Sequence, residues 1–179
     1  MEISEEKILV FDADVLIHFI QGECFSDLRL IYPKNQKVVL QKVYEELQIH
    51  SKSKTMLDSA IHTFKFLKLI NFPLNPEMMK EYAHLTSPLM DLGKGESACL
   101  SYCKFTKDVI VSSNLKDVLN YCNTHLLKHL TTLDLVLWAF ENNVWSEAQC
   151  DTFIQALIQK GARIPNVTIA QYKTSKKGN

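Results

Sequence analysis

Three short and almost continuous runs of apolar residues constrain the fold of this 179-residue chain more than any other feature. They read "KILVF" (7–11), "KVVLQ" (37–41) and "DVIVSS" (108–113). Runs of this kind are typical of strands that are buried on both faces, as in a parallel sheet covered by helices on both sides. Each run therefore predicts one short strand of such a sheet.

Helical patterns lie between and after these strands. The first covers residues 54–69, where one stripe at helical spacing is formed by Leu57, Ala60, Ile61, Phe64 and Leu67. Two further stripes near the C-terminus predict a helix around 133–140 and another around 150–158. Ser146 with Gln149 has the spacing of a capping box, and Gly161 stands where a C-terminal cap belongs. Strands that alternate with helices predict an α/β sandwich with a central, mainly parallel sheet.

The composition indicates one globular domain. Apolar residues make up 46% of the chain, as in globular proteins. Because 20 basic residues balance 20 acidic ones, the net charge does not indicate a nucleic-acid or membrane partner. We expect a single domain over residues 1–165 and a flexible basic tail over 166–179. No apolar run approaches the roughly 20 residues that span a bilayer, and the N-terminus has no secretory pattern. A cytoplasmic location without a membrane partner is therefore expected.

The five cysteines include no Cys-x-x-Cys pair, which makes a disulfide framework improbable. Cys99 and Cys103 are spaced i, i+4, as are His125 and His129, and either pair could lie on one helical face. Four such side chains could hold zinc. The apolar neighbours of the two cysteines favour buried thiols instead.

Acidic side chains follow the first two predicted strands. Asp12 and Asp14 come directly after the first strand, and the second leads into "KVYEELQIH" (42–50), which contains Glu45 and Glu46. Ligands bind beyond the carboxyl ends of the strands in open parallel sheets, so these acids are expected at that edge. Any single acid is more simply explained as a helix cap, because acids in the first turn are stabilised by the helix dipole.

Two further segments bring polar groups to the same predicted edge. The third strand ends in "SSNLKD" (112–117), and Glu96 opens an apolar helix in "LGKGESACLSYC" (92–103). Carboxylates that converge at one edge repel one another, and a divalent cation is the natural way to neutralise them. Oxygen ligands without a softer donor indicate Mg²⁺ or Mn²⁺.

Four segments together resemble the motifs of PIN-domain nucleases. "VFDADVLIHF" (10–19) resembles the first motif, "VYEEL" (43–47) the second with Glu46 as its acid, and "LGKGESACLSYC" the third with Glu96. "VIVSSNLKDVLNYC" (109–122) stands where the fourth motif belongs, but carries Ser113 and Asn114 in place of the usual Asp. The segment "LTTLDLVLWAF…LIQKGARIP" also resembles small prokaryotic PIN proteins.

The resemblance implies a three-layer sandwich and metal-dependent cleavage of RNA. It implies that Asp12, Glu46 and Glu96 hold Mg²⁺ or Mn²⁺, with Asp14 as an alternative ligand. Asn114 and Asp117 would orient the attacking water or complete the coordination shell. Many relatives are toxins paired with an antitoxin and many form dimers, so an antitoxin protein and a homodimer are possible partners.

Two other functions remain open from the sequence. "ILVFDADVLI" (8–17) also resembles the nucleophile motif of haloacid-dehalogenase-like phosphatases, in which Asp12 would be the nucleophile and Asp14 the acid/base. That family does not account for Glu46 and Glu96. The second alternative is a non-catalytic PIN-like protein that binds RNA or a partner, which the missing fourth acid favours.

Overall fold

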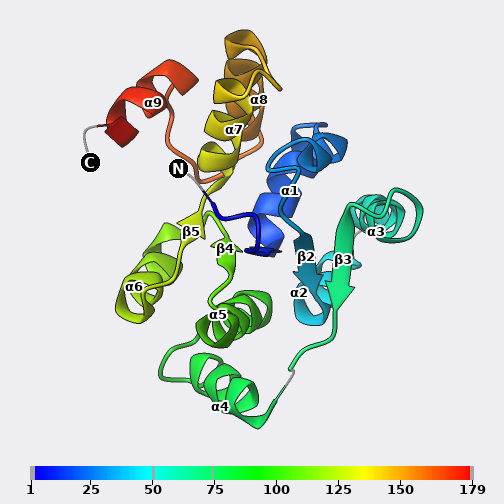
Figure 1. Cartoon of the computed structure of the whole chain (residues 1–179), viewed down its shortest axis with the longest axis vertical. Coiled ribbons are helices and arrows are strands. Elements are labelled where there is room, and N and C mark those ends of the chain that lie inside the picture. The colour runs from blue at the N-terminus through cyan, green and yellow to red at the C-terminus, as the bar shows by residue number, and fades with distance from the viewer. Residues whose placement is uncertain (1–2, 50, 74, 178–179) are drawn as a thin grey trace.

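The computed structural model describes residues 3–49, 51–73 and 75–177, without the side chains of 115–117 and 177. In this part of the chain, five strands form one sheet in the order β3-β2-β1-β4-β5, and every neighbouring pair is parallel. Helices flank the sheet (Figure 1). The predicted α/β sandwich is confirmed. The strands are β1 (Leu9–Phe11), β2 (Lys37–Leu40), β3 (Leu67–Ile70), β4 (Val109–Val111) and β5 (His129–Leu130).

The three strands predicted from apolar runs lie side by side at the centre of the sheet. Val10 of β1 is paired with Val38 of β2 on one side and with Ile110 of β4 on the other. All three side chains are fully buried. Burial on both faces is the reason why these strands lack polar alternation.

The chain forms nine α-helices among its described residues. They are α1 (Ala13–Gln21), α2 (Gln41–Leu47), α3 (Ser51–Asp58), α4 (Pro76–Leu85), α5 (Lys94–Thr106), α6 (Leu115–His125), α7 (Thr132–Glu141), α8 (Glu147–Gln159) and α9 (Ile169–Lys177). A 3₁₀ helix (η1, Phe25–Arg29) and a π-helical turn (η2, Ser59–Thr63) complete them. In Figure 1, α1, α7, α8 and α9 lie above the strands, α4 and α5 lie below them, and α6 lies to the left.

The two predicted C-terminal helices are confirmed as α7 and α8. The capping box at the start of α8 is formed in both directions, because the Ser146 hydroxyl accepts from the Gln149 N–H and the Gln149 side chain accepts from the Ser146 N–H. Gly161 follows the C-cap with φ +82°, a left-handed conformation that glycine adopts without strain.

The predicted helix over residues 54–69 is wrong in its second half. Helix α3 ends at Asp58, the chain continues through η2, and residues from Leu67 onward form strand β3. Phe64, a member of the predicted apolar stripe, is 62% exposed. Lys65 has φ +54°, which lies outside the helical range. Strand β3 pairs with β2 and forms the edge of the sheet. Pairing with a distant strand therefore overrides the local helical spacing.

The C-terminal segment contains helix α9, which packs against α7 and α8. The expected division at residue 165, with a flexible tail after it, stays a prediction. Within the described ranges, the chain contains no helix with the length and apolar character needed to cross a membrane.

Candidate active site

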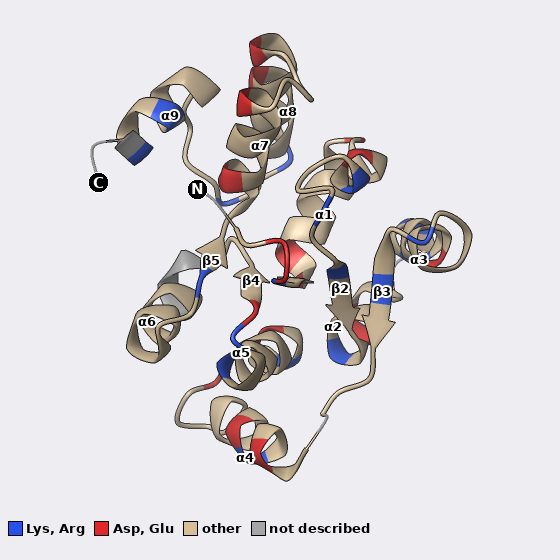
Figure 2. Cartoon of the chain, in the orientation of Figure 1, with Lys and Arg blue, Asp and Glu red and all other residues tan. Residues whose placement is uncertain are grey.

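A pocket of about 340 Å³ opens at the carboxyl ends of β1 and β4. Asp12, Glu46 and Glu96, the three acids selected from the sequence, all line it, although they come from three separate segments of the chain. The other lining residues are Ala13, Asp14, Asp91, Leu92, Gly93 and Asn114. The crossing from β1 into α1, the C-terminal half of α2 and the first turn of α5 thus contribute acids to one place. Figure 2 shows acidic residues on α2 and on the lower part of α1.

Asp12 is the most enclosed of these acids, with 6% of its surface exposed. It caps α1, where one carboxylate oxygen accepts from the Ala13 N–H at 2.8 Å and the other accepts from the Ser112 hydroxyl at 3.1 Å. Burial raises its pKa well above the usual value, and the charges of Asp14 and Glu96 raise the pKa further. The fold therefore holds the Asp12 carboxylate in an enclosed place next to two further acids.

Asp14 lies beside Asp12 and is held by the main chain that follows β4. Its carboxylate accepts from the Ser113 N–H at 2.7 Å and from the Val15 N–H at 2.6 Å. Burial raises its pKa, and these hydrogen bonds act in the opposite direction. The fully buried Ser112 hydroxyl lies within hydrogen-bonding distance of both carboxylates, at 3.1 Å from Asp12 and 3.4 Å from Asp14. It has one proton to donate, so it cannot satisfy both at once.

The two adjacent glutamates of α2 have different surroundings. Glu45 accepts hydrogen bonds from Lys42 at 3.1 Å and Gln41 at 3.2 Å, and the bond from Lys42 lowers its pKa. Glu46 lines the pocket instead. An added Cβ on Gly95 would lie 2.7 Å from Oε2 of Glu46, so α5 approaches α2 closely because position 95 has no side chain.

The fourth motif contributes an amide where an acid is usual. Asn114 donates from Nδ2 to Oε1 of Glu96 at 2.8 Å, so it stabilises the carboxylate that a fourth acid would repel. The side chain of Asp117, which the sequence also suggested, lies outside the described residues. Asp91 lines the pocket and was not selected from the sequence. Its only signal was its place just before the glycines of the third motif.

The donor set of the pocket suits a hard divalent cation, because it consists of carboxylate and amide oxygens. Among the described residues, no three His, Cys, Asp or Glu side chains already converge closely enough to hold a metal ion. The acids line a common pocket without closing on one point. Burial raises the pKa of Asp12, and the charges of Asp14 and Glu96 raise it further, so these acids interact electrostatically across the pocket.

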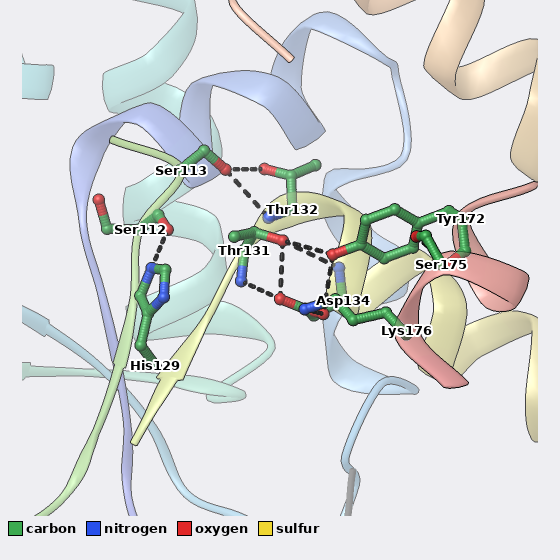
Figure 3. Close-up of polar contacts among 9 residues, drawn as sticks. All are labelled: Ser112, Ser113, His129, Thr131, Thr132, Asp134, Tyr172, Ser175 and Lys176. Carbon is green, nitrogen blue, oxygen red and sulfur yellow. Dashed lines mark hydrogen bonds and ion pairs between the residues drawn. The ribbon is translucent and has the colours of Figure 1, made fainter. Parts of the chain in front are cut away.

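A chain of hydroxyl groups connects Ser113, whose main-chain N–H donates to Asp14, to the interior. The Ser113 hydroxyl lies 2.8 Å from that of Thr132 and accepts from the Thr132 N–H at 3.0 Å, as Figure 3 shows. The Thr132 hydroxyl in turn lies 2.8 Å from Nδ1 of the buried His18. The start of α7 thereby fixes the segment that holds Asp14.

Burial lowers the pKa of His18 from 6.5 to about 4. The unfolded chain therefore binds this proton at a higher pH than the folded protein does. The stability contributed by neutral His18 is complete above pH 6.5 and is lost as the pH falls from 6.5 to 4, by about 3 kcal/mol at most. Urea unfolding across this window should show a shallower pH dependence in His18→Gln than in the wild type. Replacing the exposed His84 by Gln is the control, and an unchanged slope in His18→Gln would contradict the prediction.

Helix α9 is tied to the same region through Asp134. This carboxylate accepts from Tyr172 at 2.9 Å, pairs with Lys176 at 2.7 Å and accepts from the Thr131 N–H at 2.8 Å (Figure 3). Burial acts to raise the pKa of Asp134, but the bonds from Lys176 and Thr131 lower it below its usual value. Asp134 closes the capping box of α7 and so serves the helix start that contacts Ser113.

The zinc alternative finds little support in the geometry. Cys99 and Cys103 share α5 and are fully buried, and burial raises the pKa of both thiols. His125 ends α6, whereas His129 lies in β5, so the suggestion that the two histidines share a helical face is wrong. His129 Nε2 instead contacts the main-chain oxygen of Ser112 at 2.7 Å.

Comparison with known proteins gives one match. A family model described as a PIN domain matches residues 8–176, which include all five strands and every acid that lines the pocket. No curated protein and no solved structure matches the chain.

Proposed function

The chain belongs to the PIN-domain family, and from this membership and its acidic pocket we propose that it is a metal-dependent endoribonuclease. PIN domains are generally nucleases that use divalent metals such as Mg²⁺. The observation that carries the proposal is the convergence of Asp12, Glu46 and Glu96 on one pocket from distant parts of the sequence. The haloacid-dehalogenase-like alternative does not use Glu46 and Glu96, and the family match favours the nuclease.

Asp12, Glu46 and Glu96 would hold Mg²⁺ or Mn²⁺, with Asp14 next to them. When bound, the cation would supply an activated water and would offset charge on the departing 3′ oxygen. A phosphodiester is an anion, and a pocket lined by several carboxylates repels it unless a cation is present. This repulsion is the physical reason to expect that RNA enters the pocket only together with the metal.

The protein's own groups fix the acids in place for this task. The Ala13 N–H and the Ser112 hydroxyl orient Asp12, and Asn114 orients Glu96. Hydrogen bonds to metal-binding carboxylates keep their oxygens directed at the metal, and they reduce the rearrangement of side chains that metal binding requires. Asn114, and Asp117 one helical turn later, would also help to orient the attacking water.

Incubation with a mixture of structured RNAs tests the proposal. The wild type should cleave RNA in Mn²⁺ and be inactive in EDTA. Asp12→Asn combined with Glu96→Gln should reduce cleavage by at least about 1,000-fold, because it removes two of the charges that hold the cation. Cleavage that survives in this double variant would come from a contaminant and would leave the proposal without support.

Asn114 supports one second candidate, a non-catalytic PIN-like protein that binds RNA or a partner protein. With a neutral amide at the fourth motif, the pocket has one negative charge fewer than the family pattern. This candidate predicts RNA binding without cleavage in the same experiment. A toxin role with an antitoxin protein, a homodimer and a cytoplasmic location form part of the nuclease proposal and rest on the resemblance to PIN-domain toxins.

A further inference from the structure

A second pocket, rich in cations, lies at the opposite edge of the sheet, where β2 and β3 begin. It has a volume of about 330 Å³. Its lining residues are Arg29, Pro33, Lys34, Asn35, Gln36, Lys37, Lys65, Phe66 and Lys68, and we call it the basic pocket. Figure 2 shows the basic segments that β2 and β3 contribute. Because the strands are parallel, this pocket and the acidic pocket lie at opposite ends of the same sheet.

Lys37 is the least expected member of the basic pocket. It is only 4% exposed, and its ammonium group donates to the main-chain oxygens of Tyr32 at 3.0 Å and Asn35 at 3.4 Å. Within the described ranges no carboxylate pairs with it. Burial lowers its pKa to about 8. A buried ammonium that is held by carbonyl groups alone is costly, and a bound anion would offset that cost.

The rim of the basic pocket adds further positive charge. Arg29, Lys65 and Lys68 are exposed, and in the part of the chain that the structure describes none of them forms an ion pair. Lys34 is the exception, because it pairs with Glu5. Cations around a concave surface raise the local concentration of anions. The basic pocket therefore combines a charged rim with a buried charge at its wall.

We propose that the basic pocket binds phosphate groups. Two sources share this chemistry, the phosphodiester backbone of an RNA strand and free phosphate or pyrophosphate. Binding of the RNA backbone would extend the proposed function, because the basic pocket would then hold the substrate at a distance from the acidic pocket. The assignment to RNA rests on the proposed function. The half-buried Phe66 offers a ring against which a ribose or base can pack.

Binding is measured in EDTA, so that the result does not depend on cleavage. The variant combines Arg29→Glu with Lys68→Glu, both on exposed side chains, and circular dichroism checks its fold. The control combines Lys54→Glu with Lys80→Glu, which changes net charge equally at exposed positions outside the basic pocket. The ligands are a labelled single-stranded RNA of 12 nucleotides, followed by anisotropy, and inorganic pyrophosphate, followed by calorimetry.

For the RNA backbone, we expect affinity to fall at least about tenfold more in the variant than in the control. Each lost phosphate contact on a single strand reduces the slope of log K against log salt by about 0.7, so two should reduce it by about 1.4. Loss of pyrophosphate binding without loss of RNA binding would assign the pocket to free phosphate. Equal behaviour of variant and control toward both ligands would overturn the proposal.

Cleavage by the wild type in Mn²⁺, together with equal binding by the variant and the control, would reject the phosphate pocket and leave the nuclease proposal intact. RNA binding that is lost in the variant, together with a wild type that does not cleave RNA in Mn²⁺, would support the pocket and reject the nuclease. The two proposals can therefore fail separately.

Discussion

Asp12→Asn should abolish the stabilisation that Mn²⁺ gives to the folded protein. A cation that binds only the folded state stabilises it, by about 2.7 kcal/mol at a free concentration 100 times its Kd. For a domain of this size we expect a rise in melting temperature of about 5–10 °C in the wild type. Differential scanning fluorimetry with and without Mn²⁺ measures both values, and the variant should show no rise.

Without metal, the same substitution should leave stability unchanged or raise it. Asn caps a helix as well as Asp, and its oxygen can still accept from the Ala13 N–H. The substitution also removes a buried negative charge that lies beside Asp14. The metal response can therefore be lost without unfolding, which separates a ligand from a residue that only supports the structure.

Glu45→Gln is the matched control for this experiment. Glu45 is the neighbour of Glu46 on α2, but its partners are Lys42 and Gln41 and it does not line the acidic pocket. The control should keep the full response to Mn²⁺. An equal rise in melting temperature in Asp12→Asn would place the cation elsewhere and remove the basis of the proposed chemistry.

The parts of the fold that the sequence predicts are those that local pattern determines. The β1 run is apolar on both faces because both faces are covered, and the capping box at Ser146 is a contact between near neighbours. Strand β3 was missed because its apolar residues also fit a helical stripe. Only its pairing with β2, about 30 residues away, decides between the two. The two-residue strand β5 is too short to show a pattern of its own.

The residues of the acidic pocket also fall into those that the sequence identifies and those that only the tertiary structure reveals. Asp12 directly follows a strand, Glu96 opens a helix and Glu46 stands in "VYEEL", and each lies in a segment with motif-like spacing. Ser112 follows the third strand in "SSNLKD", but the sequence gives it no role, and Asp91 was not selected. The hydroxyl of Ser112 acquires its role only when β4 lies beside β1, 100 residues away in sequence, and Asp91 reaches the pocket through a loop. Their places depend on tertiary structure, which one sequence does not display.

Gly95→Ala should reduce RNA cleavage by about 10- to 100-fold while the protein stays folded. The added Cβ would lie 2.7 Å from Oε2 of Glu46 and 3.2 Å from Cγ2 of Val43. The end of the Glu46 side chain can move away at little cost in stability. That same movement displaces one of the acids proposed to hold the metal, and a displacement of about 1 Å can cost 100-fold in rate.

The sign of the stability change shows whether Gly95 is needed for this close approach. At an ordinary position inside a helix, replacing Gly by Ala stabilises by about 1 kcal/mol. At Gly95 the crowding against α2 should cancel that gain, as measured by urea unfolding. Gly93→Ala is the control from the same motif, because an added Cβ there meets no atom within 4 Å. It should retain the response to Mn²⁺, because the added Cβ does not displace Glu46. A Gly95→Ala protein that is both more stable and fully active would show that Glu46 does not need its present position, and the metal would then have to be held without it.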